Sequence, residues 1–277
     1  MVDNQKSEFS MKKQSEYFDA ASFFNKHISS YDARHDVAPG GWDCYCVRFA
    51  KKSLLEGSLS NNTFLDVGAG AGRFASLIKR HIPYLQVTAL DPSVNLLSKS
   101  EDRSIRKVVG KIPDLPFNLK ERFFFIHVEC VFHHVVEQTI SESREKVKQS
   151  LLALRECLAD SGFLMIEEEY WETYVFAGAS RTLAFLLLKI ARKLDIDVPW
   201  FLNPSDESLR GLIVCMYTRS ELKNLVRDCS FELVEFKDLP FNGSSPYRQR
   251  FKKLMFLKRS GRVLLIAKKS QASSEGT

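Results

Sequence analysis

The chain has 277 residues, of which 44% are hydrophobic and 27% charged, with a formal net charge of +6. This composition is typical of a globular protein with a sizeable core and excludes a fibrous or disordered chain. The mild positive charge permits an anionic partner without requiring one. The longest apolar run, Leu183–Leu188, is much shorter than the roughly 20 residues of a membrane-spanning helix, so no transmembrane segment is expected.

Both ends of the chain, residues 1–14 and 269–277, are polar and are expected to be disordered. Residues 16–31 suggest one or two amphipathic helices, and residues 43–57 a further helix. The six cysteines are scattered and no secretory signal precedes them, so reduced thiols in the cytoplasm are expected. Only Cys44 and Cys46 lie close together, and no second pair follows at the spacing of a zinc site. No metal is therefore expected.

Strands and helices alternate between residues 58 and 170. Strands are expected at 64–67, 86–90, 107–109, 123–128 and 163–167, and helices at 73–80, 94–100 and 143–158, with a turn over 160–162. Repeated strand–helix–strand spacing of this kind predicts a doubly wound, mostly parallel α/β sheet with helices on both faces.

The alternation is interrupted by residues 171–217, which are too long for an ordinary connection and are predicted to form a helical cap insertion. It resumes over 218–268, with a helix at 220–228 and strands at 231–236 and 262–267. No long helix separates these last two strands, so we expect them to form an antiparallel pair at the edge of the sheet.

The stretch LDVGAGAG, residues 65–72, follows the first predicted strand and has glycine at every second position from Gly68. A bare backbone between a strand and a helix lets a ligand reach main-chain N–H groups. The spacing of these glycines is not the G-x-G-x-x-G of a dinucleotide site, and Asp66 stands two residues before the first of them. A carboxylate there favours a ligand with an ammonium group over a diphosphate. Asp91 ends the next strand, about 20 residues after Gly72, where an acid can accept hydrogen bonds from ribose hydroxyls.

The run Asp66-Val-Gly68-Ala-Gly70-Ala-Gly72 resembles the first motif of the class I S-adenosylmethionine-dependent methyltransferases, over residues 60–168 and, by topology, 218–268. The resemblance implies a seven-stranded Rossmann-like sheet, an N-terminal helical lid over residues 1–57 and S-adenosylmethionine as cofactor. The residues implied at the cofactor are Tyr31, Asp66, Gly68, Ala69, Gly70, Gly72, Arg73, Asp91, Pro92, Ser93, Lys111, Ile112, Glu129 and Cys130.

Two positions depart from the pattern of this family. Lys111 replaces the acid that usually contacts the adenine amine, so neighbouring backbone would have to accept that hydrogen bond. Phe124 replaces the aspartate usual at the start of the fourth strand, and a buried strand tolerates an aromatic residue there.

Methyl transfer from a sulfonium is a direct displacement, in which aligning the acceptor with the methyl group lowers the barrier. A general base is needed only where the acceptor still carries its proton. His133, His134 and Glu168 lie where the fourth and fifth strands end, and they are candidate bases or substrate contacts. The same residues would also suit a helix cap or a solvated strand end.

Apolar and aromatic residues are frequent in 171–217, which favours a roof over a hydrophobic or aromatic acceptor. A homodimer face and a helix resting on lipid are the competing interpretations. The basic stretch 248–262 is expected to be a solvated face or hairpin, so no nucleic-acid partner is expected.

The sequence thus predicts a methyltransferase that acts on an oxygen, nitrogen or carbon atom of a small, rather apolar molecule. Two alternatives stay open. One is a module of the same fold that binds the cofactor without catalysis or has lost it, and the other is an RNA-modifying enzyme.

Overall fold

The structure, a computed structural model, describes residues 43–56, 62–118, 121–173, 178–194, 213–239 and 257–270. Several sequence predictions fall outside these residues: the lid before residue 43 with Tyr31, part of the cap, the first part of the basic stretch, and the tail beyond residue 270.

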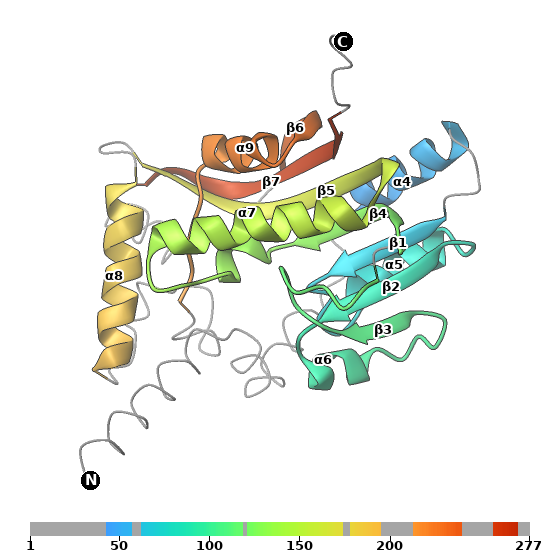
Figure 1. The fold of residues 1–277 in the computed structure, drawn as a ribbon, viewed down its shortest axis with the longest axis horizontal. Helices are drawn as coiled ribbons and strands as arrows, with labels where there is room; N and C mark the ends of the chain where they lie inside the picture. Colours follow the sequence, from blue (N-terminus) through green and yellow to red (C-terminus); the bar gives the residue numbers. More distant parts are fainter. Residues whose placement is uncertain are drawn as a thin grey trace.

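Seven strands of the described chain form one sheet in the order β3-β2-β1-β4-β5-β7-β6 (Figure 1). The strands are β1 (Thr63–Val67), β2 (Gln86–Asp91), β3 (Arg106–Val109), β4 (Phe123–Glu129), β5 (Leu158–Thr173), β6 (Phe231–Leu239) and β7 (Leu257–Lys269). β1 to β5 run parallel, whereas β7 is antiparallel to both β5 and β6. The predicted α/β fold with an antiparallel last strand is confirmed.

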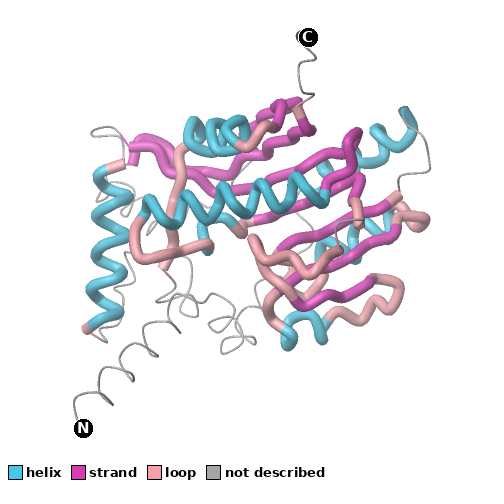
Figure 2. The backbone as a smooth tube through the Cα atoms, in the orientation of Figure 1, coloured by secondary structure: helices cyan, strands magenta, loops and turns pink. Residues whose placement is uncertain are grey.

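Helices cover both faces of this sheet (Figures 1 and 2). Those in the described part of the chain are α4 (Asp43–Glu56), α5 (Arg73–His81), α6 (Val94–Lys99), α7 (Ile140–Cys157), α8 (Ala179–Lys193) and α9 (Arg219–Asp228), together with the 3-10 helix η1 (Phe132–His134). Apolar side chains of α7, α8 and α9 share one core with the sheet, and those of α4 and α5 share a second core. The sheet is therefore buried on both sides, as its apolar strands require.

Helix α7 begins at Ile140, three positions before the predicted start at residue 143. Its N-terminus is a capping box, in which Thr139 Oγ1 accepts from the Glu142 N–H and the Glu142 carboxylate accepts from the Thr139 N–H. The T-x-x-E spacing that makes this cap was present in the sequence, but apolar periodicity alone does not locate it.

The predicted turn over residues 160–162 is wrong, because β5 starts directly at Leu158. Phe123 of β4 pairs with Leu158 and Phe125 with Phe163, so the intervening residues of β5 form a bulge in a continuing strand. A Cβ on Gly162 would lie 2.7 Å from the carbonyl oxygen of Phe124, which explains glycine at this crowded position.

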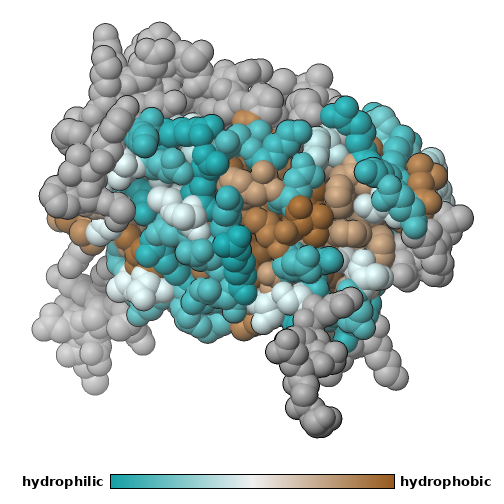
Figure 3. All heavy atoms as spheres, turned by 90° about the horizontal axis from the view of Figure 1, so that it is seen from above, coloured by the Kyte–Doolittle hydropathy of each residue, from teal (hydrophilic) through white to brown (hydrophobic). Residues whose placement is uncertain are grey.

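No helix in the described ranges has the length and apolar character needed to cross a membrane. Hydrophilic side chains cover most of the described surface in the view from above, and hydrophobic ones gather in a central patch (Figure 3).

Candidate functional site

The strand order reverses between β1 and β4, and open α/β sheets have their ligand-binding crevice at the carboxyl ends of two such strands. From β1 the chain passes outward through β2 to β3 and then returns to β4 on the other side of β1. Val67, the last residue of β1, pairs with Leu90 on one side and Val128 on the other. Loops that leave neighbouring strands in opposite directions open a crevice at this edge, where open α/β sheets bind their ligands.

The glycine loop lies in this crevice. Gly68, Gly70 and Gly72 have φ angles of 71°, 55° and 74°, a region that side chains disfavour. The N–H groups of Gly68 and Ala69 both donate to the carbonyl of Leu90, at 2.8 and 3.0 Å, so the loop after β1 is fixed to β2.

Asp91 is bonded to this loop. Its Oδ2 accepts from the Gly70 N–H and its Oδ1 from the Ser93 N–H, each at 2.8 Å. Burial raises the pKa of Asp91, and the two backbone hydrogen bonds oppose that rise. Each carboxylate oxygen can accept a further hydrogen bond. Asp91 can thus shape the glycine loop and still accept from a ligand, a structural task that its sequence position did not reveal.

Ser93, Pro92, Lys111 and Ile112 lie around the end of β2. Ser93 is buried and caps α6 by accepting from the Leu96 N–H at 3.1 Å. Pro92 is half-buried, Lys111 is exposed, and Ile112 is buried in the core that also contains β2. Since the Gly110 N–H donates to the carbonyl of Asp91, the stretch predicted at the adenine lies beside the predicted ribose contact.

Asp66 is buried at the centre of the sheet, and its Oδ1 lies 2.9 Å from Nδ1 of His127 on β4. The ring of Phe74 stacks on that histidine with centroids 3.9 Å apart. Burial alone would lower the pKa of His127, but contacts with Asp66, Cys46 and Glu167 outweigh it and raise that pKa well above its usual value. The other carboxylate oxygen of Asp66 is buried and has no hydrogen-bond partner among the described residues.

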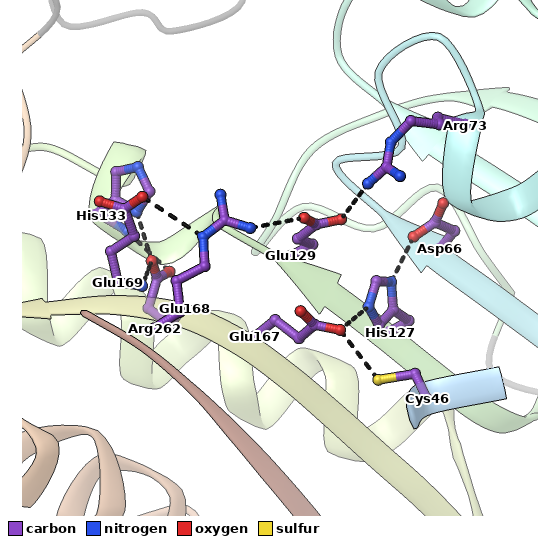
Figure 4. Close-up of polar contacts among 10 residues, drawn as sticks. All are labelled: Cys46, Asp66, Arg73, His127, Glu129, His133, Glu167, Glu168, Glu169 and Arg262. Atoms are coloured by element: carbon purple, nitrogen blue, oxygen red, sulfur yellow. Dashed lines mark hydrogen bonds and ion pairs between the residues drawn. The ribbon is translucent and has the colours of Figure 1, made fainter. Parts of the chain in front are cut away.

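A chain of alternating charges crosses the carboxyl edge of the sheet (Figure 4). Arg73 Nη2 lies 3.5 Å from Glu129 Oε2, Arg262 Nη1 lies 3.2 Å from Glu129 Oε1, and Arg262 Nε lies 3.6 Å from Glu169 Oε1. Burial and the nearby Glu167 raise the pKa of Glu129, while Arg262 and Arg73 oppose the rise. Two cations therefore favour the ionised form of a carboxylate at the mouth of the crevice.

The structure pairs two of the three predicted catalytic residues. His133 Nδ1 lies 2.5 Å from Glu168 Oε1, and Glu168 is fully buried. The carboxylate of Glu168 also accepts from the N–H groups of Phe132 at 2.9 Å and Glu169 at 2.8 Å. Burial would lower the pKa of His133, but the charge and the hydrogen bond of Glu168, together with the charge of Glu169, outweigh burial and raise that pKa. An imidazole oriented by a buried carboxylate is the arrangement of a positioned general base.

The third predicted catalytic residue, His134, packs against His133 with ring centroids 3.9 Å apart. Burial and the positive charge of His133 hold the pKa of His134 well below its usual value. Cys130 has a φ of 52°, donates its N–H to the carbonyl of Glu167, and has a thiol pKa raised by burial. These properties suit a backbone turn beside the crevice and not a reactive thiol.

The predicted site residues did not include Cys46, His127, Glu167 and Arg262, although Glu167 belongs to the same run of glutamates as the predicted Glu168. A histidine inside the apolar run FFFIHVE was the one available signal, since a buried polar group needs partners. Arg262 faces Glu169 only because of the antiparallel register of β5 and β7, which the sequence does not display.

Residues 45–236 match a family described as a methyltransferase domain. The chain belongs to that family. A demethylmenaquinone methyltransferase of Thermotoga maritima is 30% identical over 100 residues, which is 35% of this chain and 43% of that protein. The match thus spans less than half the length of that relative.

Solved structures of methyltransferases have the same fold at low identity. An S-adenosylmethionine-dependent methyltransferase from Clostridium acetobutylicum matches with a TM-score of 0.54 at 15% identity, covering 90% of this chain and 99% of that chain. Phospholethanolamine N-methyltransferase 2 of Haemonchus contortus has a TM-score of 0.58 at 12% identity, covering 91% and 60%. The plantazolicin methyltransferase BpumL has a TM-score of 0.54 at 13% identity, covering 98% and 100%. The predicted superfamily is confirmed.

Proposed function

We propose that this protein transfers the methyl group of S-adenosylmethionine to an oxygen, nitrogen or carbon atom of a small, apolar or aromatic molecule. The observation that carries the proposal is the glycine loop between Asp66 and Asp91, at the point where the strand order reverses. Membership of the methyltransferase family supports the same reaction and the same cofactor.

The residues of the crevice fit such a cofactor. The buried Asp66 Oδ2, which lacks a hydrogen-bond partner in the described chain, and the Glu129 carboxylate can accept from an ammonium group. Arg73, at the N-terminus of α5, offers a cation for the carboxylate of the methionine part of the cofactor, which also carries that ammonium group. Asp91 offers its remaining acceptor sites to ribose hydroxyls, and the polypeptide at Gly110 and Ile112 borders the adenine.

The cofactor, when bound, supplies a methyl group made electrophilic by a positive sulfur. In such a displacement the acceptor atom would form a bond to the methyl carbon, and the sulfur would keep the electron pair of the broken carbon–sulfur bond as S-adenosylhomocysteine. For an acceptor that carries a proton, His133 Nε2 takes it, because Nδ1 is engaged by Glu168. Glu168 is then a positioning residue, and His134, with its lowered pKa, stays neutral.

The segment between β5 and α9 supports a small acceptor held under a cap. Buried Arg181 joins α8 to the core through Glu221 and the carbonyl of Met216, and the Cys215 N–H donates to the carbonyl of His133 at 2.9 Å. The base and the cap are therefore tied to the same short stretch of chain. Two structural neighbours are named as methyltransferases of plantazolicin and of phospholethanolamine, and neither name mentions a nucleic acid.

The test measures the formation of S-adenosylhomocysteine from S-adenosylmethionine in the presence of candidate methyl acceptors. The acceptors are a panel of phenols, amines and quinol-like carbon acids, and, separately, transfer RNA. Turnover with a small acceptor that is lost in His133→Gln supports the proposal. Binding of the cofactor without turnover of any acceptor would favour the non-catalytic alternative, and turnover with RNA alone would favour the RNA-modifying one.

A further inference from the structure

Three potential metal ligands converge beneath the cofactor crevice (Figure 4). Cys46 projects from α4, His127 from the middle of β4 and Glu167 from β5, and one ligand atom of each lies within 4.8 Å of the other two. All three residues are fully buried. None of them touches the acceptor side of the site, where His133 and Glu168 lie, so the proposed methyl transfer does not explain them.

The polar atoms of this cluster are only partly satisfied by one another. Cys46 Sγ lies 3.1 Å from Glu167 Oε1, whereas His127 Nε2 lies 3.6 Å from the same oxygen, which is too far for a hydrogen bond. Among the described residues neither His127 Nε2 nor Glu167 Oε2 has a hydrogen-bond partner. Buried polar atoms without partners are uncommon and call for an explanation, such as an ion.

The spacing fits a tetrahedral Zn²⁺ ion. Bonds of about 2.0–2.3 Å to nitrogen, oxygen and sulfur place the ligand atoms of such a site about 3.3–3.8 Å apart. The distances of 3.1 and 3.6 Å from Glu167 Oε1 to the cysteine and histidine atoms lie close to that range. Thiolate, imidazole and carboxylate together favour zinc over the hard cations Mg²⁺ and Ca²⁺.

The surroundings of His127 orient it for this task. Asp66 Oδ1 engages Nδ1 at 2.9 Å, and Phe74 stacks on the ring, so Nε2 is directed at Cys46 and Glu167. A carboxylate on the far nitrogen of a metal-bound histidine fixes the tautomer and raises the basicity of the ligand. One carboxylate oxygen of Asp66 would thus bond to the histidine, and the other would face the crevice.

We propose that Cys46 Sγ, His127 Nε2 and Glu167 Oε1 bind one Zn²⁺ ion. Binding releases the thiol proton of Cys46 and any proton on His127 Nε2, and no electron is transferred. A thiolate and a carboxylate balance the two charges of the ion, which leaves the buried centre neutral. The described residues contribute no fourth side chain to the group, and in our proposal a water molecule occupies the fourth position. The ion would link α4 to the two central strands of the sheet.

The rival occupant is a proton. Over the same three residues, an imidazolium at His127 and the carboxylate of Glu167 also balance, with Cys46 as a thiol, and Asp66 bonds to Nδ1 in either state. The two states differ in the sulfur, which is a metal-bound thiolate in one and a protonated thiol in the other.

The experiment uses the full chain, purified under reducing conditions, stripped with a chelator and titrated with Co²⁺ as a spectroscopic substitute for zinc. We expect one equivalent to produce a thiolate-to-cobalt charge-transfer band with the intense visible bands of tetrahedral Co²⁺, and Zn²⁺ to abolish both. Elemental analysis of the unstripped protein should give close to one zinc per chain.

The matched variants are Cys46→Ser and Cys229→Ser, since Cys229 is equally buried but lies beside the carbonyl of Lys148 on the other face of the sheet. The charge-transfer band should vanish in the first and persist in the second. A folded wild-type chain that gives no band and contains no zinc has the proton-bound state, which overturns the proposal. A band that survives in Cys46→Ser overturns it equally, because another thiol is then the ligand.

Discussion

Glu168 on β5 holds the imidazole of His133, with 2.5 Å between its Oε1 and the Nδ1 of the ring. The carboxylate is itself fixed by backbone N–H groups of Phe132 and Glu169. Glu168 therefore acts on the orientation and the charge of the histidine, and not directly on an acceptor.

The first prediction concerns the pH dependence that follows from this pair. Glu168 raises the pKa of His133, and a base acts only when deprotonated, so the rate should rise with pH through an apparent pKa above the usual histidine value. Glu168→Gln keeps an acceptor for the ring but removes the charge. The rising limb should then move to lower pH while the maximal rate falls, as kcat profiles across pH would record.

Removal of the histidine itself should be more damaging. For a protic acceptor, His133→Gln should lower kcat about 100- to 10,000-fold, the usual contribution of a general base, with little change in cofactor affinity. His134→Gln is the control, since its imidazole is not bonded to Glu168. An equal loss in the two variants would argue against the assignment of the base.

The glycine loop requires glycine at position 68, where φ is 71° and the backbone faces Val131. A Cβ there would lie 2.4 Å from Val131 Cγ2, so Gly68→Ala should destabilise the fold by about 1–3 kcal/mol through the backbone strain, with a further loss from the clash. Urea denaturation measures both effects. The double variant Gly68→Ala/Val131→Ala should recover only part of the loss, because trimming the valine removes the clash and leaves the strain.

Arg262 should tune cofactor binding through Glu129. Its guanidinium favours the ionised carboxylate against burial, so in Arg262→Gln the pKa of Glu129 should rise. Cofactor affinity should then fall at neutral pH and recover as pH increases, which calorimetry at several pH values would detect. Arg259→Gln, on the same strand but paired with Asp238 at 3.1 Å, should bind normally throughout.

The attachment of the cap depends on Arg181, a buried guanidinium on α8 that pairs with Glu221 on α9. Removing one partner of a fully buried ion pair typically costs about 3–5 kcal/mol. Glu221 is partly exposed and keeps Arg144 as a partner, so Arg181→Met should be destabilising by less than that. Arg144→Met removes a more exposed partner of the same glutamate and should cost clearly less. Hydrogen exchange should show faster exchange over α8 in the first variant alone.

The fold was predictable from the sequence because its signals are local. Alternating apolar segments located the strands, and the missing helix before the last strand indicated the antiparallel pair. The bulge in β5 was missed because Asp160-Ser161-Gly162 has the composition of a turn, and only pairing with β4 shows that the strand continues through it.

The site was predictable only in part. The glycine loop, Asp66 and Asp91 are contiguous or regularly spaced, so the sequence reveals them. Cys46, His127 and Glu167 are separated by long stretches and meet only through helix packing and strand register, which is why a search for paired cysteines predicted no metal there. The same reason hides Arg262 on β7, which reaches Glu129 on β4 across the intervening strand β5.

The central claim is that the crevice between β1 and β4 binds S-adenosylmethionine, and isothermal titration calorimetry tests it most directly. The wild-type chain should bind S-adenosylmethionine and S-adenosylhomocysteine at one site per chain, and Asp91→Ala should bind neither with comparable affinity. Asp102→Ala, which removes a partly exposed acid from the loop before β3, should bind like the wild type. A folded chain that binds neither compound, or an Asp91→Ala variant that binds as tightly as the wild type, would contradict the account.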